Sequence, residues 1–308
     1  MQTKRRFSSK LLTLFVIGIF ALGLVLPKQF VLASANDWQL QLMGADKAQE
    51  DGYQGSGVKV GIIDNKFDGA SHGDLVAAVV KHIAPATSIL TYSVQGSQEK
   101  MDSRTLANAI ITAVKNGVHI INISLGTEEE DEYVKAAITQ AVDAGIIVVA
   151  SSGNNGNYLD ETKVYYPAAD ERVIAVGAVD QRGEYLKESN YGQVKAPGEF
   201  VFKNQTYVGT SIAAPYVSGL LAIYMEQHDT KDVKSLLLNN VNEKNIVQYK
   251  RLVKGIDKVL LEVTIEVAEN LIKDEDYTEA SKDAVVKALV DAKLVMKDED
   301  VTQELVDD

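Results

Sequence analysis

The chain has 308 residues, of which 46% are hydrophobic and 24% are charged, and its formal net charge is −12 at pH 7. This balance predicts a globular protein with one large domain and a small appendage, and it excludes disordered, collagen-like and multispanning chains. Phosphate binding relies on clustered Lys and Arg, so the acidic balance argues against a nucleic-acid partner or an anionic membrane surface. Because the chain contains no cysteine, we expect the core rather than disulfides to stabilise it.

The N-terminus has the three parts of an export signal. The basic stretch "MQTKRRFSSK" precedes the uncharged apolar run "LLTLFVIGIFALGLVL", and Ala33-Ser34-Ala35 supplies the small residues that a signal peptidase needs. We therefore predict a Gram-positive-type signal peptide over residues 1–35, and a protein that is secreted or held at the extracellular face of the cell envelope. The alternative is a retained N-terminal membrane anchor, because the length of the apolar run approaches the lower limit for spanning.

Short runs rich in Val and Ile alternate with amphipathic segments from residue 57 onward. The runs predict buried strands, at 58–64, 119–125, 145–151 and 172–179. The amphipathic segments carry apolar residues at three- and four-residue spacings and predict helices, at 103–116, 131–144 and 211–227. This alternation predicts an α/β fold with three layers, in which helices cover both faces of a parallel sheet. Beyond residue 260 the composition changes to that of a small helical appendage.

Four polar residues stand where a strand ends or a helix begins. Asp64 ends the first strand in "GIIDNKFD", His72 opens an apolar segment in "SHGDLVAAVV", Asn154 follows a strand in "SSGNNG", and Ser211 opens the last helix in "GTSIAAPYVSG". Taken alone, each has an ordinary explanation as a turn residue, a polar loop residue or a helix cap. Taken together, they should meet at one edge of the sheet, where reactive groups gather in such folds.

These residue types suit acyl transfer. A carboxylate can orient a histidine, the histidine can activate a serine, and a side-chain amide can donate to the oxyanion that forms. The order Asp, His, Ser and the sequence "GTSIA" exclude an α/β-hydrolase, which would run Ser, acid, His and carry a G-x-S-x-G turn.

Over about residues 36–260 the chain resembles the subtilisin-like serine proteases (subtilases, peptidase S8). The resemblance rests on "GVKVGIID", "SHGDLVAAVV", "INISLG", "VVASSGNNG", "VIAVGAVD", "APG" and "GTSIAAPYVSG", in that order. It implies that Asp64 orients His72, that His72 is the general base, that Ser211 is the nucleophile and that Asn154 is the oxyanion donor. Two sets of residues would bind an extended polypeptide substrate: Ser124, Leu125 and Gly126 by strand addition, and Ser151, Ser152 and Gly153 as the pocket for the residue before the cut.

The chain departs from the family pattern near the histidine. Asn65-Lys66 replaces the usual Thr-Gly or Ser-Gly, "HGDL" replaces "HGTH", and "GTSIA" replaces "GTSMA". Asp74 is close enough in sequence to raise the pKa of His72 or to compete for its proton. Asp64 and His72 are eight positions apart, whereas the family normally inserts a much longer segment. "SHGDL" also resembles a non-catalytic "HPDL" stretch of many subtilases, and on that alignment the protein would be inactive.

The resemblance has two further implications. The shortened segment between Asp64 and His72 lacks a loop that holds calcium in many subtilases, so we predict no metal at that place and no other cofactor. The short interval between residues 36 and 57 leaves no room for the folding propeptide of most secreted subtilases, so we expect the chain to fold unaided or with help in trans. We expect a monomer.

The C-terminal segment resembles a truncated FIVAR module, a three-helix unit of exported surface proteins in Gram-positive bacteria. We accordingly divide the chain into a signal peptide at 1–35, a peptidase domain at 36–259 and a helical appendage at 260–308. The appendage is either a truncated module, which would allow association with the cell envelope, or a solvated acidic pair of helices.

The sequence therefore predicts a secreted serine endopeptidase that works through an acyl-enzyme. The compact catalytic domain favours a dedicated processing protease over a scavenging one. Two alternatives remain open from sequence: an inactive subtilase fold that binds extended peptides or a partner protease, and a structural protein of the envelope. The inactive fold differs from the first reading in whether His72 reaches Ser211. The structural protein would need the helical appendage to be the functional part, and it leaves the pattern of Asp64, His72 and Ser211 unexplained.

Overall fold

The computed structural model describes residues 37–95, 102–156, 163–228 and 233–253, together with a few residues between 265 and 290. The chain divides into two compact units, Met1–Ser34 and Ala35–Asp308, and the elements below belong to the second. The predicted signal peptide and most of the predicted appendage lie outside the described residues. No helix within the described part of the chain has the length and apolar character of a membrane span.

The core of the fold is a six-stranded parallel sheet with the strand order β2-β1-β3-β4-β5-β6. Its strands are β1 (Lys59–Asp64), β2 (Ser88–Ser93), β3 (Ile120–Ile123), β4 (Ile147–Ser151), β5 (Ile174–Val179) and β6 (Val194–Pro197). The predicted strands thus correspond to β1, β3, β4 and β5. The two edge strands were not predicted, and in β2 the residues are only partly covered.

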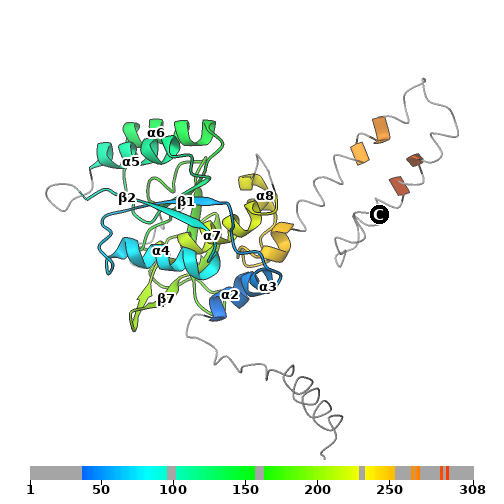
Figure 1. Cartoon of the computed structure of the whole chain (residues 1–308), viewed down its shortest axis with the longest axis horizontal. Helices are drawn as coiled ribbons and strands as arrows, with labels where there is room; N and C mark the ends of the chain where they lie inside the picture. Colours follow the sequence, from blue (N-terminus) through cyan, green and yellow to red (C-terminus); the bar gives the residue numbers. More distant parts are fainter. Residues whose placement is uncertain are drawn as a thin grey trace, which may run out of the picture. The chain divides into compact units, whose positions relative to one another are not determined.

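Helices cover both faces of the sheet, which confirms the predicted three-layer α/β architecture (Figure 1). They are α2 (Asp37–Met43), α3 (Ala45–Glu50), α4 (His72–Ile83), α5 (Ser103–Lys115), α6 (Glu132–Asp143), α7 (Thr210–Met225) and α8 (Val233–Asn239). Successive side chains of a strand point to opposite faces. In β1, Val60 and Ile62 accordingly join the core under α4 and α7, while Ile63 joins the core under α5 and α6.

Local sequence explains where the outer helices begin and end. Asp102 caps α5 by accepting a hydrogen bond from Arg104 N, and Asp131 caps α6 by accepting from the first backbone N–H groups of that helix. Gly117 and Gly145 follow these helices with φ of 63° and 76°, a conformation that glycine adopts without strain. Both helices therefore end near the positions that the glycines predict.

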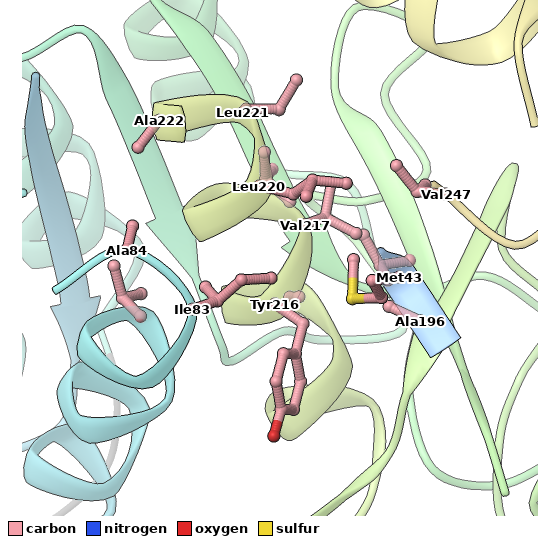
Figure 2. Packing of buried hydrophobic residues seen from close by; sticks show 14 of the residues in the cluster. Met43, Ile83, Ala84, Ala196, Tyr216, Val217, Leu220, Leu221, Ala222 and Val247 are labelled. Carbon is pink, nitrogen blue, oxygen red and sulfur yellow. The ribbon is translucent and has the colours of Figure 1, made fainter. Parts of the chain in front are cut away.

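The helix α7 runs through the centre of the domain (Figure 1) and is buried along nearly its whole length. Figure 2 shows the packing of its apolar side chains. Leu220, Leu221 and Val217 of α7 pack in the same cluster as Ile83 at the end of α4. A Cβ at Gly219 would overlap Cγ2 of Ile83, so the two helices approach closely only because this position is glycine. The contact holds the first residues of α7 near the first residue of α4.

A β-hairpin leads into α7. It consists of β7 (Glu199–Phe202) and β8 (Gln205–Val208), which pair antiparallel. The turn residues Lys203 and Asn204 both have positive φ, at 50° and 61°, as a two-residue hairpin turn requires. The hairpin was not predicted, because its strands are short and its turn lacks glycine.

Candidate active site

A polar cleft of about 330 Å³ lies at the carboxyl ends of β1, β3 and β4, beside the N-termini of α4 and α7. Its lining is Asp64, Asn65, His72, Ser124, Leu125, Gly126, Ser151, Gly153, Asn154, Asn155, Tyr165, Thr210 and Ser211. Parallel strands end at a common edge, and the following helices begin there, which is why these distant segments meet. All four residues singled out at strand ends and helix starts therefore lie in one cleft.

His72 bridges Asp64 and Ser211. Its Nδ1 lies 2.8 Å from Asp64 Oδ2, and its Nε2 lies 3.0 Å from Ser211 Oγ. Asp64 is 1% exposed, whereas the side chain of His72 is 41% exposed, so the carboxylate is shielded and the imidazole faces the cleft. Asp64 Oδ1 also accepts a hydrogen bond from Asn65 N at 2.8 Å, which fixes the orientation of the carboxylate. The short spacing between Asp64 and His72 thus still allows contact.

Asp74 has a structural role at the start of α4. Its Oδ2 accepts hydrogen bonds from Ser71 Oγ and from the backbone N–H groups of Asp68, Gly69 and Ser71, at 2.6 to 3.0 Å. Ser71 and Asp74 form a capping box. Burial acts to raise the pKa of Asp74, but these hydrogen bonds outweigh it and lower the pKa below its ordinary value. The Asp74 carboxylate therefore caps the start of α4, and its hydrogen bonds go to the cap rather than to His72.

The position of Ser211 depends on Pro215. In an α-helix the N–H of residue 215 would donate to the carbonyl of residue 211, but proline has no N–H. Ser211 O instead accepts a hydrogen bond from Ser124 Oγ at 3.0 Å. Ser124 Oγ in turn accepts from Asn122 Nδ2 at 2.9 Å, and Asn122 Oδ1 accepts from Ser218 Oγ at 2.9 Å. This buried network ties the start of α7 to the end of β3.

The amide of Asn154 is oriented by Thr210. Asn154 Oδ1 accepts hydrogen bonds from Thr210 N and Thr210 Oγ1, both at 2.9 Å. Because Oδ1 faces Thr210, the Nδ2 group on the other side of the amide does not donate to this residue. Gly209 has φ of 140°, and a Cβ there would lie 3.1 Å from both the oxygen and the nitrogen of this amide. Gly209 therefore lets the chain pass close to Asn154 just before Ser211.

The predicted substrate-binding residues line the cleft, with one exception. Two segments of the chain line the cleft: residues 124–126, just after β3, form its first wall, and Ser151 and Gly153, at the end of β4, belong to its second wall. Ser152 does not line the cleft. It is fully buried, and its hydroxyl donates to Asn190 O at 2.9 Å, because successive residues at the end of β4 point in opposite directions.

Four cleft residues were not singled out from sequence: Asn65, Asn155, Tyr165 and Thr210. Thr210 could have been suspected because it adjoins Ser211 in "GTSIA". Asn155 and Tyr165 meet only through the fold, since Asn155 Nδ2 donates to the OH of Tyr165, ten positions further along the chain. Among the residues that the structure describes, no cluster of three or more His, Asp or Glu side chains is arranged to hold a metal.

A serine aligned with a histidine and a buried carboxylate, on the edge of a parallel sheet, is an arrangement of serine hydrolases. The Peptidase S8 model, described as the subtilase family, matches residues 69–257. Subtilisin DY of Bacillus licheniformis is 33% identical over 232 residues, which cover 62% of this chain and 85% of that protein. Subtilisin E of Bacillus subtilis is 30% identical over 221 residues, which cover 58% of each. The chain belongs to the subtilase family and is a serine-type endopeptidase.

Solved structures agree with this assignment. The prenylagaramide maturation protease PagA is 26% identical, with a TM-score of 0.58, and the match covers 70% of this chain and 97% of PagA. A lanthipeptide protease has a TM-score of 0.60 over 71% of this chain and 94% of its own, but at 22% identity it supports the fold alone. The family match begins at residue 69, so the role of Asp64 depends on the geometry of the cleft.

Proposed function

We propose that this subtilase is a secreted endopeptidase that hydrolyses peptide bonds with Asp64, His72 and Ser211 as its triad. The observation that carries the proposal is the double contact of His72, 2.8 Å to Asp64 and 3.0 Å to Ser211. A histidine held in this way has one nitrogen for the carboxylate and one for the serine hydroxyl. The inactive alternative needs His72 to lie away from Ser211, so the same contact favours catalysis.

The reaction runs through an acyl-enzyme. Ser211 Oγ attacks the substrate carbonyl carbon while His72 Nε2 takes the hydroxyl proton, and Asp64 stabilises the imidazolium through Nδ1. The imidazolium then gives its proton to the leaving amine as the peptide C–N bond breaks. Water, activated by His72, attacks the ester carbonyl and releases the acid product together with free Ser211.

Asn154 stabilises the charge that develops on the carbonyl oxygen. Its Oδ1 accepts from Thr210 N and Thr210 Oγ1, so Nδ2 is the group of this amide that can donate to the substrate carbonyl. A donor fixed before the reaction begins needs no reorganisation when the oxyanion forms. The backbone of residues 124–126 on the facing wall is suited to pair with an extended substrate.

A processing role is the narrower form of the proposal. PagA, one of the structural relatives, is described as a maturation protease, and the match covers nearly all of its chain. The N-terminal pattern of basic, apolar and small residues supports export. We therefore place the enzyme outside the cell, acting on a polypeptide that reaches the cleft in extended form.

Hydrolysis of an unfolded protein such as casein by the purified enzyme tests the triad. Ser211→Ala and His72→Ala should each lower kcat by about 10⁶-fold, and Asp64→Asn by about 10⁴-fold. The double variant of Ser211 and His72 should be no worse than either single variant, because the residues act as a unit. His119→Ala changes an exposed histidine outside the cleft and should leave kcat unchanged. Retention of activity in folded His72→Ala would refute the assignment of the base.

A further inference from the structure

The cleft has two walls that both attach to the start of α7, one to Ser211 and the other to the preceding Thr210. The wall at residues 124–126 is tied to Ser211 O by Ser124 Oγ, and the wall at residues 151–154 is tied to Thr210 by Asn154 Oδ1. A substrate that pairs with the first wall and places its carbonyl between Ser211 and Asn154 must direct the side chain before the cut into the gap between the walls. What fills this gap therefore sets which residue the enzyme accepts there.

Tyr165 occupies the gap. A Cβ at Gly153 would lie 2.9 Å from Cγ and 3.1 Å from Cδ1 of the Tyr165 ring, so the ring lies directly against the backbone of Gly153. On the other side, a Cβ at Gly126 would lie 3.4 Å from Cβ of Tyr165 and 2.7 Å from Tyr166 O. Both walls have glycine where the tyrosine touches them, and Tyr165 spans the distance between them.

The phenol is held in place at its far end as well. Tyr165 OH donates to Glu128 Oε1 at 3.1 Å and accepts from Asn155 Nδ2, while Tyr165 N donates to Ser152 O at 2.9 Å. Asn155 is itself fixed by its backbone N–H, which donates to Asn190 Oδ1 at 2.8 Å. Burial and the neighbouring Glu128 raise the pKa of Tyr165, so the phenol keeps its proton and remains a donor. Moving the ring aside would break both side-chain hydrogen bonds.

We propose that Tyr165 closes the floor of the pocket for the residue before the cut, so that this enzyme cleaves after Gly, Ala or Ser and excludes large side chains. The inference rests on the proposed function, because it takes Ser211 and Asn154 as the groups that position the carbonyl. A small side chain fits in front of the ring, whereas Leu or Phe would have to displace it. Glu128 does not line the cleft, and its Oε1 accepts from the phenol, so a basic side chain before the cut would have to displace the ring to reach it.

The test compares peptides that differ only in the residue before the cut, with Ala, Leu, Phe or Lys at that place. The concentration of active enzyme is first measured with a small alkyl fluorophosphonate, which reacts with the serine without using the pocket. For the wild-type enzyme, kcat/KM should be at least about tenfold higher for Ala than for Leu, Phe or Lys, the discrimination that a few misfitting methylenes produce. Tyr165→Gly should raise kcat/KM for Phe at least about tenfold and leave the value for Ala within a few-fold.

Matched variants separate the size of the ring from its hydrogen bonds. Tyr165→Phe keeps the ring and should keep the preference for Ala. Tyr53→Gly makes the same change as Tyr165→Gly at an exposed tyrosine outside the cleft, and it should behave as wild type. Tyr165→Ala replaces Tyr165→Gly if the glycine variant does not fold, as judged by the titrated fraction of active enzyme.

Two results would overturn the inference while leaving the proposed function intact. One is a titrated wild-type enzyme that cleaves after Phe or Lys as fast as after Ala. The other is a titrated Tyr165→Gly or Tyr165→Ala enzyme whose preference does not change. A folded wild-type protein that does not react with the fluorophosphonate would instead overturn the proposed function, and the pocket inference with it.

Discussion

Ser211 and Asn154 are both positioned by hydrogen bonds from neighbouring residues of the cleft. Ser124 satisfies the Ser211 carbonyl that Pro215 leaves unpaired, and Thr210 fixes the oxygen of the Asn154 amide. A nucleophile and an oxyanion donor that are fixed before the substrate arrives lose little free energy to ordering during the reaction. The chemistry at this scale thus depends on hydrogen bonds that the short motif "GTSIAAP" partly encodes.

Asn154→Ala should lower kcat by about 10²- to 10³-fold and leave KM within a few-fold, because the lost hydrogen bond forms only in the transition state. Steady-state kinetics on a peptide with Ala before the cut measures both constants. Asn116→Ala, at the end of α5, removes an amide far from the cleft and should leave both constants unchanged. A rise in KM at constant kcat would show that Asn154 binds the ground state instead.

The candidate residues were predictable from sequence because Asp64, His72, Asn154 and Ser211 each lie beside a recognisable strand or helix boundary. Tyr165 was not, because a tyrosine in "VYYPAAD" has the same local pattern whether it faces the core or the cleft. Its neighbour Tyr166 is in fact buried, while Tyr165 lines the cleft. Contacts such as Tyr165 with Gly153 arise from the fold and leave no trace in local spacing.

At the scale of elements, α4 and α7 carry the histidine and the serine into contact. The start of α4 is held by the capping box of Ser71 and Asp74. Gly219 allows α7 to pack closely on Ile83 at the other end of α4. The distance of 3.0 Å between His72 and Ser211 therefore depends on the packing of two helices as well as on the two side chains.

Asp74→Asn should lower the free energy of unfolding by about 1 kcal/mol at neutral pH, because the cap loses its charged acceptor. The pKa of Asp74 is lower in the folded chain than in the unfolded chain, so its contribution is complete above the unfolded pKa. It is lost as the pH falls through the folded pKa. Urea unfolding of both proteins from neutral to acidic pH should show the difference shrinking toward acid. A difference that grew toward acid would contradict the assignment.

Gly219→Ala should destabilise the protein by about 1–3 kcal/mol despite the higher helix propensity of alanine, because the new methyl group overlaps Ile83. Ile83→Leu removes the Cγ2 atom that the methyl group meets. The double variant Gly219→Ala/Ile83→Leu should therefore recover part of the loss. Chemical unfolding of the wild type, the two single variants and the double variant gives the coupling free energy between residues 219 and 83. If the two changes in the free energy of unfolding simply add, this contact does not limit the spacing of α4 and α7.

Element types followed from sequence wherever a pattern was long and regular. The strand at β1 and the helices α5, α6 and α7 match their predicted segments closely, because continuous Val and Ile runs and apolar spacing determine them. The edge strand β2 and the hairpin of β7 and β8 did not stand out. Edge strands and hairpins are more exposed to solvent than the central strands of the sheet, so their sequences lack a continuous apolar run.

At the scale of the whole molecule, the segment before β1 is part of the catalytic domain. Met43, Ala45 and Ala48 of α2 and α3 are buried in the core that contains α7. Gln39 Nε2 donates to Glu199 O at 2.8 Å, and so connects α2 to the hairpin that precedes Ser211. Residues 37–50 therefore close one side of the domain.

The proposed peptidase domain, residues 36–259, should unfold cooperatively and react with a fluorophosphonate as the full chain does. A shorter fragment, residues 52–259, should unfold at a lower temperature or fail to fold, because it exposes the apolar surface that α2 and α3 cover. Thermal unfolding followed by circular dichroism compares the two. Equal stability of both fragments would contradict the placement of the domain boundary.

The central claim is that His72 activates Ser211 for attack on a carbonyl. The most direct measurement is the reaction of the purified protein with a fluorophosphonate, followed by mass spectrometry of the labelled peptide. The account predicts a single modification on Ser211 in the wild-type protein, and none in folded His72→Ala or Ser211→Ala. Absence of labelling in the folded wild-type protein, or labelling that survives in His72→Ala, would contradict it.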